Sequence, residues 1–252
     1  MKHEERMQLA GSISARVVAR LPGDVVISGV YGSTARNTDT QWSDLEMLFV
    51  VRSGSTFRGR QFLYRGMPIG LIVIERNKLE HQLANPDFGW WDYLMHTLAS
   101  MMVLYGDPEQ VLTWLRLGQS VPSAKYREVL EANLSWLVHE PFGRIKSCLV
   151  RRNERDVGSA VMETLRHMQG ALCLLNERWA ANNTTYQGFV DTFSFTKLPE
   201  GWHDLIPTLW SMRDMDQIVP MAEKLVNNFW QLLADEGVKL PVNYQAVEDL
   251  PL

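Results

Sequence analysis

The chain has 252 residues and a formal net charge of −4, and hydrophobic residues make up 46% of it. This length and apolar content suffice for one large domain or two modest ones. The acidic balance argues against a nucleic-acid partner, whose binding surface is normally basic. No apolar run reaches the roughly 18 residues of a membrane helix, so no membrane partner is expected.

The first residues of the chain and its cysteine content indicate a cytoplasmic protein. Charged residues interrupt its first stretch, so no signal peptide is visible. The chain has only two cysteines, Cys148 and Cys173, which suits a reducing compartment.

The first part of the chain has the pattern of an α/β domain. An amphipathic helix is expected over residues 4–21 and ends at Pro22-Gly23. Apolar β-branched runs predict strands near residues 25–31, 44–52 and 69–75, and a helix near 76–84 follows the last of them.

Beyond Pro86 the β signal largely disappears. Helices are predicted near residues 90–104, 108–117, 123–140, 157–180 and 215–236. The expected fold is therefore an α/β N-terminal domain over residues 1–120, with a small mixed sheet and flanking helices, followed by an all-helical domain over 121–252.

The most informative motif lies between the first two predicted strands. Gly32-Ser33 follows the first strand, and Asp44 and Glu46 begin the second. Alternate strand residues face the same side, so the two carboxylates are expected to project together. Such a pair suits a hard cation such as Mg²⁺, and a Gly-Ser turn suits the phosphates that this cation carries.

These residues resemble the nucleotidyltransferase superfamily that includes DNA polymerase β. More narrowly, the segments Gly29–Ser33, Thr38-Asp39 and Ser43–Met47, together with Arg36, look like the kanamycin nucleotidyltransferase family of aminoglycoside 4'-O-adenylyltransferases. The resemblance implies that the enzyme uses ATP and Mg²⁺ and works as a homodimer with shared active sites. It also implies that the C-terminal domain binds substrate and forms the dimer.

The resemblance implies a role for each motif residue. Asp44 and Glu46 would be the metal ligands and part of the catalytic machinery. Gly32, Ser33 and Arg36 would bind the nucleotide. Judged without the resemblance, Arg36 is better interpreted as a solvated loop residue.

A third acid of the family is missing from this chain. Its position falls on Gly70 when the residues are counted without gaps. Glu75 is the nearest acid, but strand parity turns it to the opposite face. We therefore expect a metal site with two protein carboxylates, completed by phosphate oxygens and water.

The family's catalytic base is also displaced. Its position falls on Gly143, which has no proton chemistry, and Glu140 is the nearest carboxylate. Glu140 is the predicted base, with a salt bridge to Arg144 as the structural alternative, and Lys146 is predicted to neutralise phosphate. Pro141 is expected to kink or end the helix at Glu140.

Further residues are predicted to contact ligands. Asp87, Asp92 and His139 would bind the cationic substrate, and the resemblance implies that Thr184 or Thr185 contacts the nucleotide. By contrast, His96 lies in an aromatic segment where a satisfied, partly buried histidine is the simpler interpretation.

The favoured function is AMP transfer from ATP to the 4'-hydroxyl of an aminoglycoside. One alternative is a nucleotidyltransferase that modifies a protein or an RNA. Another is an inactive nucleotide-binding protein, which the glycines at positions 70 and 143 would explain.

Overall fold

The computed structural model describes residues 1–135, 139–180, 186–212, 214–242 and 245. The chain forms two compact units. The first unit comprises Met1–Pro86 and Tyr93–Val121. The second unit comprises Asp87–Asp92 and Pro122–Leu252.

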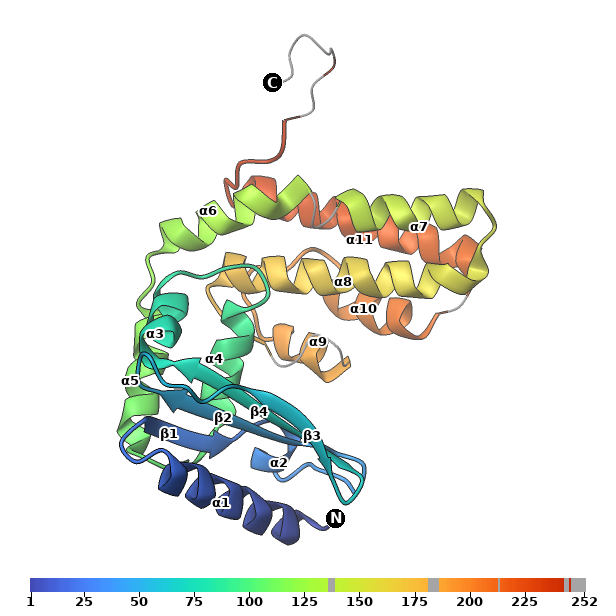
Figure 1. Cartoon of the computed structure of the whole chain (residues 1–252). Helices are drawn as coiled ribbons and strands as arrows, with labels where there is room; N and C mark the ends of the chain where they lie inside the picture. Colours follow the sequence, from blue (N-terminus) through green and yellow to red (C-terminus); the bar gives the residue numbers. More distant parts are fainter. Residues whose placement is uncertain (136–138, 181–185, 213, 243–244, 246–252) are drawn as a thin grey trace. The chain divides into compact units, whose positions relative to one another are not determined.

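A five-stranded mixed sheet forms the first unit (Figure 1). Its strands are β1 (Val25–Val30), β2 (Leu45–Val51), β3 (Arg60–Tyr64), β4 (Met67–Glu75) and β5 (Met102–Tyr105). Their order is β3-β4-β2-β1-β5, and only the β2–β4 pair among them is parallel. The helices are α1 (His3–Arg20), α2 (Gly32–Ala35), α3 (Arg76–Ala84), α4 (Trp91–Ser100), whose first two residues belong to the second unit, and α5 (Pro108–Gln119).

Strand alternation determines which side chains reach the core under α1. Ala10 of α1 packs with Val30, Met47, Phe49 and Leu71, which point to the same face of the sheet. Figure 1 shows α1 along this face and α3 on the other side. Side chains that alternate with the α1-facing set are free to line a site on the opposite face.

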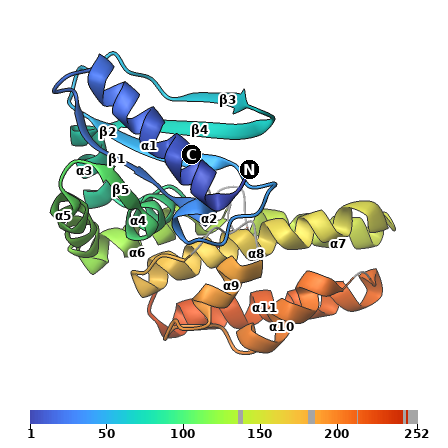
Figure 2. The same ribbon diagram turned by 90° about the horizontal axis from the view of Figure 1, so that it is seen from below.

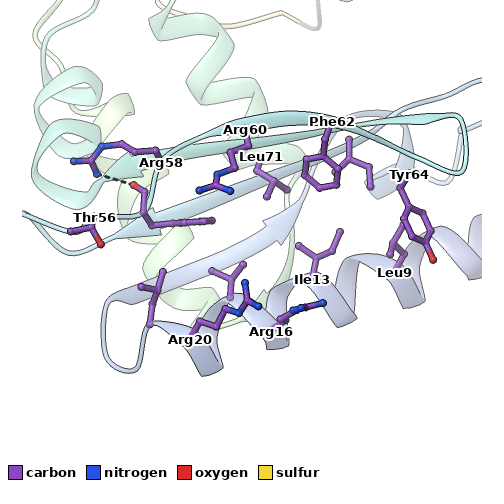
Figure 3. Close-up of a pocket in the computed structure, with 14 residues that line it drawn as sticks. Leu9, Ile13, Arg16, Arg20, Thr56, Arg58, Arg60, Phe62, Tyr64 and Leu71 are labelled. Atoms are coloured by element: carbon purple, nitrogen blue, oxygen red, sulfur yellow. Dashed lines mark hydrogen bonds between the residues drawn. The ribbon is translucent and has the colours of Figure 1, made fainter.

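A hollow of about 550 Å³ opens on the α1 side, between α1 and the β3–β4 edge. Figure 3 shows arginines around apolar side chains such as Ile13 and Leu71. Leu71 follows Gly70 directly in β4, so this hollow lies on the face of the sheet away from Gly70.

The second unit is helical. Its helices are α6 (Ser123–Leu134), α7 (Glu140–Val150), α8 (Glu154–Asn176), α9 (Tyr186–Thr192), α10 (Trp202–Ser211) and α11 (Met215–Asp235). The long helix α8 packs against all five of the others (Figure 2). Thirteen of its residues are buried, so α8 is the centre of this unit's core.

The predicted fold class is confirmed: a small mixed sheet with flanking helices precedes a helical region. Other details of the prediction are wrong. Strands β3 and β5 and helices α2, α7, α9 and α10 were not expected. The predicted helix over 90–104 ends at Ser100 and gives way to β5. Met102–Tyr105 is a short apolar run, whose periodicity does not distinguish a strand from a helix.

Pro141 was expected to kink or end a helix at Glu140, but it lies in the first turn of one. Helix α6 stops at Leu134, and α7 begins at Glu140 with Pro141 in its first turn. A proline fits there because the first backbone N–H groups of a helix have no partner within it.

Among the described residues, no helix combines the length and the apolar character needed to cross a membrane. Both cysteines are free and buried.

Candidate active site

The turn after β1 brings backbone close to a carboxylate. Gly32 has φ +71°, in the left-handed region that favours glycine. A Cβ at this position would collide with Oε2 of Glu46. The backbone N–H of Thr38 donates to the carbonyl of Ser33 at 3.0 Å and closes the loop. Glycine therefore suits the backbone conformation, and any larger residue would have to displace the Glu46 carboxylate.

The two predicted metal ligands lie together at the start of β2. Asp44 directly precedes the strand and is exposed, whereas Glu46 is half-buried within it. Leu45, between them, is completely buried and faces the α1 side. Asp44 and Glu46 therefore project to the other face, as the alternation predicts.

The closeness of the Asp44 and Glu46 carboxylates has an electrostatic cost. Burial raises the pKa of Glu46, and the neighbouring Asp44 carboxylate raises this pKa further. A hydrogen bond from Tyr31 and the charge of Arg36 act in the opposite direction, but the pKa of Glu46 remains above its usual value. A divalent cation between the two carboxylates would offset the repulsion.

Two tyrosines, which sequence reasoning missed, support Glu46. The hydroxyls of Tyr31 and Tyr93 lie 2.9 Å apart, with their rings edge to face. Burial raises the pKa of each tyrosine, so both remain hydrogen-bond donors at neutral pH. Tyr31 directly precedes Gly32, so its place in the motif could have identified it as a site residue. Tyr93 is 62 residues away, and only the fold brings it here.

A hollow of about 540 Å³ in the first unit contains the pair. This volume is in the usual range for a small-molecule site. Its lining residues are Tyr31, Asp44, Glu46, Gln61, Phe62, Leu63, Pro68, Ile69, Gly70, Ile72 and Tyr93.

Gly70 pairs with Glu46 across the parallel strands, and a Cβ there would meet no atom within 4 Å. Space for a third acid is thus present, but the acid is absent. Glu75 pairs with Lys78 at 2.9 Å and accepts from the backbone of Gly54 at 3.3 Å. It lies five residues along β4, roughly 16 Å from Gly70 at the usual rise per strand residue.

Arg36 also belongs to this neighbourhood. Its Nη1 lies 3.2 Å from Nε2 of His96. Arg36 is exposed and lowers the pKa of Glu46 through its charge, so its guanidinium is oriented near the carboxylates and accessible to a ligand.

The predicted residues in and just before α7 form ion pairs and ring contacts within the second unit. Glu140 accepts from Arg144 at 2.7 Å, as the structural alternative proposed. Lys146 pairs with Glu223 at 2.8 Å, and His139 stacks on the Trp230 ring at 4.7 Å between centroids. The salt bridge of Glu140 does not test its role as the base, which stays a prediction.

The remaining predicted contacts are in the same unit. Asp87 accepts from the backbone N–H of Trp91 at 2.9 Å, at the start of α4. Asp92 lies near the buried thiol of Cys173: burial raises the pKa of this thiol, and the charge of Asp92 raises it further. The segment Thr184-Thr185 lies outside the described residues.

Comparison with known proteins agrees with the motif. The chain matches no protein-family model. It is 43% identical over 232 residues to an aminoglycoside nucleotidyltransferase (4') of Staphylococcus aureus, covering 91% of this chain and 89% of the relative. A Bacillus protein of the same name is 21% identical over the same shares.

A solved structure shares the fold. The nucleotidyltransferase-like protein of Exiguobacterium sibiricum 255-15 has a TM-score of 0.51 and 14% identity, covering 91% of this chain and 75% of that one. The family predicted from the Gly-Ser and Asp-x-Glu motif is confirmed. The chain belongs to the aminoglycoside nucleotidyltransferase (4') family.

Proposed function

We propose that this nucleotidyltransferase moves AMP from ATP to the 4'-hydroxyl of an aminoglycoside antibiotic and so confers resistance to it. The observation that carries the proposal is the Asp44–Glu46 pair, set against the Gly32 turn in a hollow of about 540 Å³. The names of the two relatives support the substrate class and the position of transfer.

The donor set fits Mg²⁺. Asp44 and Glu46 supply carboxylate oxygens, and their mutual repulsion favours a cation between them. No convergent group of three or more His, Cys, Asp or Glu occurs in the described part of the chain. Phosphate oxygens and water would fill the other positions, as Mg²⁺ allows. When bound, Mg²⁺ would offset the negative charge that develops on the phosphates.

The first unit would orient the nucleotide. Ser33 would donate its hydroxyl to the β- and γ-phosphates, and Arg36 would add a fork of donors. Tyr31 would keep Glu46 aimed into the hollow through its hydrogen bond.

Proton transfer is assigned to Glu140. The attacking 4'-oxygen bonds to the α-phosphorus, the bond to pyrophosphate breaks, and Glu140 takes the hydroxyl proton. Lys146 would neutralise phosphate, and Thr184 would contact the nucleotide. Asp87, Asp92 and His139 would contact the drug, so we expect its affinity to fall with added salt.

Residues 1–120 would bind the nucleotide, and residues 121–252 would bind the drug and form the homodimer. The cytoplasmic location remains a prediction, as does the absence of a nucleic-acid partner.

Replacing Glu140 separates its two interpretations. Glu140→Gln should lower kcat by on the order of a hundredfold if Glu140 is the base. The matched control is Glu163→Gln, because Arg144 also donates to Glu163, at 2.7 and 2.8 Å. We expect this control to keep most of its turnover. A Glu140→Gln enzyme with most of its turnover would rule out the base role.

Removing the Tyr31 hydroxyl should change the pH dependence. The hydrogen bond from Tyr31 lowers the pKa of Glu46, so Tyr31→Phe should raise this pKa. The acidic limb of the kcat/KM profile should then move to higher pH, because protonated Glu46 no longer binds Mg²⁺. An unchanged acidic limb, measured at fixed Mg²⁺, would show that the hydroxyl does not support Glu46.

The acceptor is tested by pyrophosphate release from ATP and Mg²⁺ with tobramycin or with dibekacin, which lacks the 4'-hydroxyl. We expect release with tobramycin only. Equal release would assign the transfer to another hydroxyl. No release with either drug would favour a macromolecular acceptor or an inactive protein.

A further inference from the structure

A buried arginine connects α1 to the loop that precedes Asp44. Arg6 is 0% exposed. Its Nη1 donates to Oδ2 of Asp39. Its Nη2 donates to the carbonyl oxygens of Thr40, at 2.9 Å, and Ser43, at 3.0 Å. One guanidinium thus contacts the loop at three points.

Asp39 is held from both sides. Its side chain is 1% exposed, and Oδ1 lies 2.7 Å from Nδ1 of His3. Oδ2 accepts from Arg6. Burying a charged pair costs desolvation free energy that must be offset by good geometry and further hydrogen bonds. Here the carbonyls of Thr40 and Ser43 supply those hydrogen bonds.

The Ser43 carbonyl is the contact closest to the metal pair. This carbonyl and the backbone nitrogen of Asp44 belong to one peptide group, which is planar. Holding the oxygen therefore limits how far this peptide plane, from which the Asp44 side chain departs, can move. The range of positions open to the Asp44 carboxylate is narrowed accordingly.

Asp44 needs this support more than Glu46 does. Glu46 lies within β2 and accepts a hydrogen bond from Tyr31. Asp44 precedes the strand, is exposed, and its carboxylate has no hydrogen bond or ion pair with any described residue. Its backbone is what directs it.

We propose that Arg6 is a positioning residue, which holds Asp44 at the separation from Glu46 that a divalent cation requires. This inference rests on the proposed function, because it assigns the cation to that pair. Arg6 touches neither carboxylate of the pair and acts through the backbone of the loop.

The test compares Arg6→Lys with Ser14→Ala. Lysine retains the charge that pairs with Asp39 but lacks the fork that reaches two carbonyls. Ser14 is a matched control on the same helix: it is 3% exposed, and its hydroxyl lies 2.5 Å from that of Ser28 in β1. Its loss should affect stability without affecting the loop.

Two readouts separate positioning from general stability. The first is hydrogen exchange of residues 40–45 in the metal-free protein, which should accelerate in Arg6→Lys and not in Ser14→Ala. The second is the Mg²⁺ concentration that gives half-maximal thermal stabilisation with a non-hydrolysable ATP analogue. Arg6→Lys should raise this concentration by on the order of ten- to a hundredfold, the usual effect of losing support behind a metal ligand.

Three results would overturn the proposal. If Arg6→Lys needs no more Mg²⁺ than the wild type, or if Ser14→Ala raises the requirement equally, Arg6 only stabilises the fold. If Arg6→Lys does not fold, Asp39→Asn takes its place, because it removes the ion pair that orients the Arg6 guanidinium toward the two carbonyls, and the same comparison decides. A wild-type protein that Mg²⁺ does not stabilise would overturn the metal assignment as well, which separates the two failures.

Discussion

Changing Asp44 to Asn or Glu46 to Gln is expected to lower turnover by about a thousandfold or more. Loss of a metal ligand removes several kcal/mol of charge stabilisation in the transition state, and about 4 kcal/mol corresponds to a factor of a thousand. The measurement is kcat for pyrophosphate release at saturating Mg²⁺ and ATP. Retention of a tenth of the wild-type rate by either variant would contradict the account.

Glu46→Gln should raise the stability of the metal-free protein, although it lowers turnover. The pKa of Glu46 is raised in the folded protein, so the folded state binds more protons than the unfolded state between the two pKa values. Stability without metal therefore falls as pH rises through this window. Glutamine does not ionise, so Glu46→Gln removes this loss of stability.

The check is thermal melting in EDTA at pH 5 and pH 8. We expect Glu46→Gln to melt above the wild type at pH 8, with a smaller difference at pH 5. Mg²⁺ should raise the melting temperature of the wild type more than that of the variant. A variant that is less stable than the wild type at pH 8 would show that the pair carries no repulsion.

Replacing Gly32 with Ala is expected to have the second-largest effect. The residue has φ +71°, and a Cβ would collide with Oε2 of Glu46. The backbone conformation alone costs about 1–2 kcal/mol, and the collision must displace either the turn or the carboxylate. A displacement of about 1 Å at a reacting centre can cost on the order of a hundredfold in rate.

A matched glycine separates the two contributions. Gly66 also has positive φ, +80°, but a Cβ there would meet no atom within 4 Å. Gly66→Ala should lose similar stability, measured by urea unfolding, and keep wild-type turnover. If both variants lose turnover equally, the backbone cost, and not the Glu46 carboxylate, explains the effect.

The sequence predicted the part of the site that depends on local geometry. Gly32 and Ser33 were expected at a turn, and Asp44 and Glu46 on one face of a strand, because both follow from neighbouring residues. The parallel pairing of Glu46 with Gly70 agrees with the ungapped count that placed a glycine at the third acid's position.

The parts that were missed depend on long-range contacts. Tyr93 on α4 reaches Tyr31 after β1, and Arg6 on α1 reaches the loop before Asp44, only once the first unit has folded. No spacing along the chain encodes these contacts. Strand β5 was missed for a similar reason, since its pairing with β1 is what distinguishes it from the end of a helix.

The most direct test of the account is the mass of the product formed from tobramycin, ATP and Mg²⁺. We expect the drug to gain one adenylyl group, with fragmentation assigning the group to the 4'-oxygen. Asp44→Asn should give no such product under the same conditions. Unmodified tobramycin with the wild-type protein, or an adenylyl group on a different oxygen, would contradict the proposed reaction.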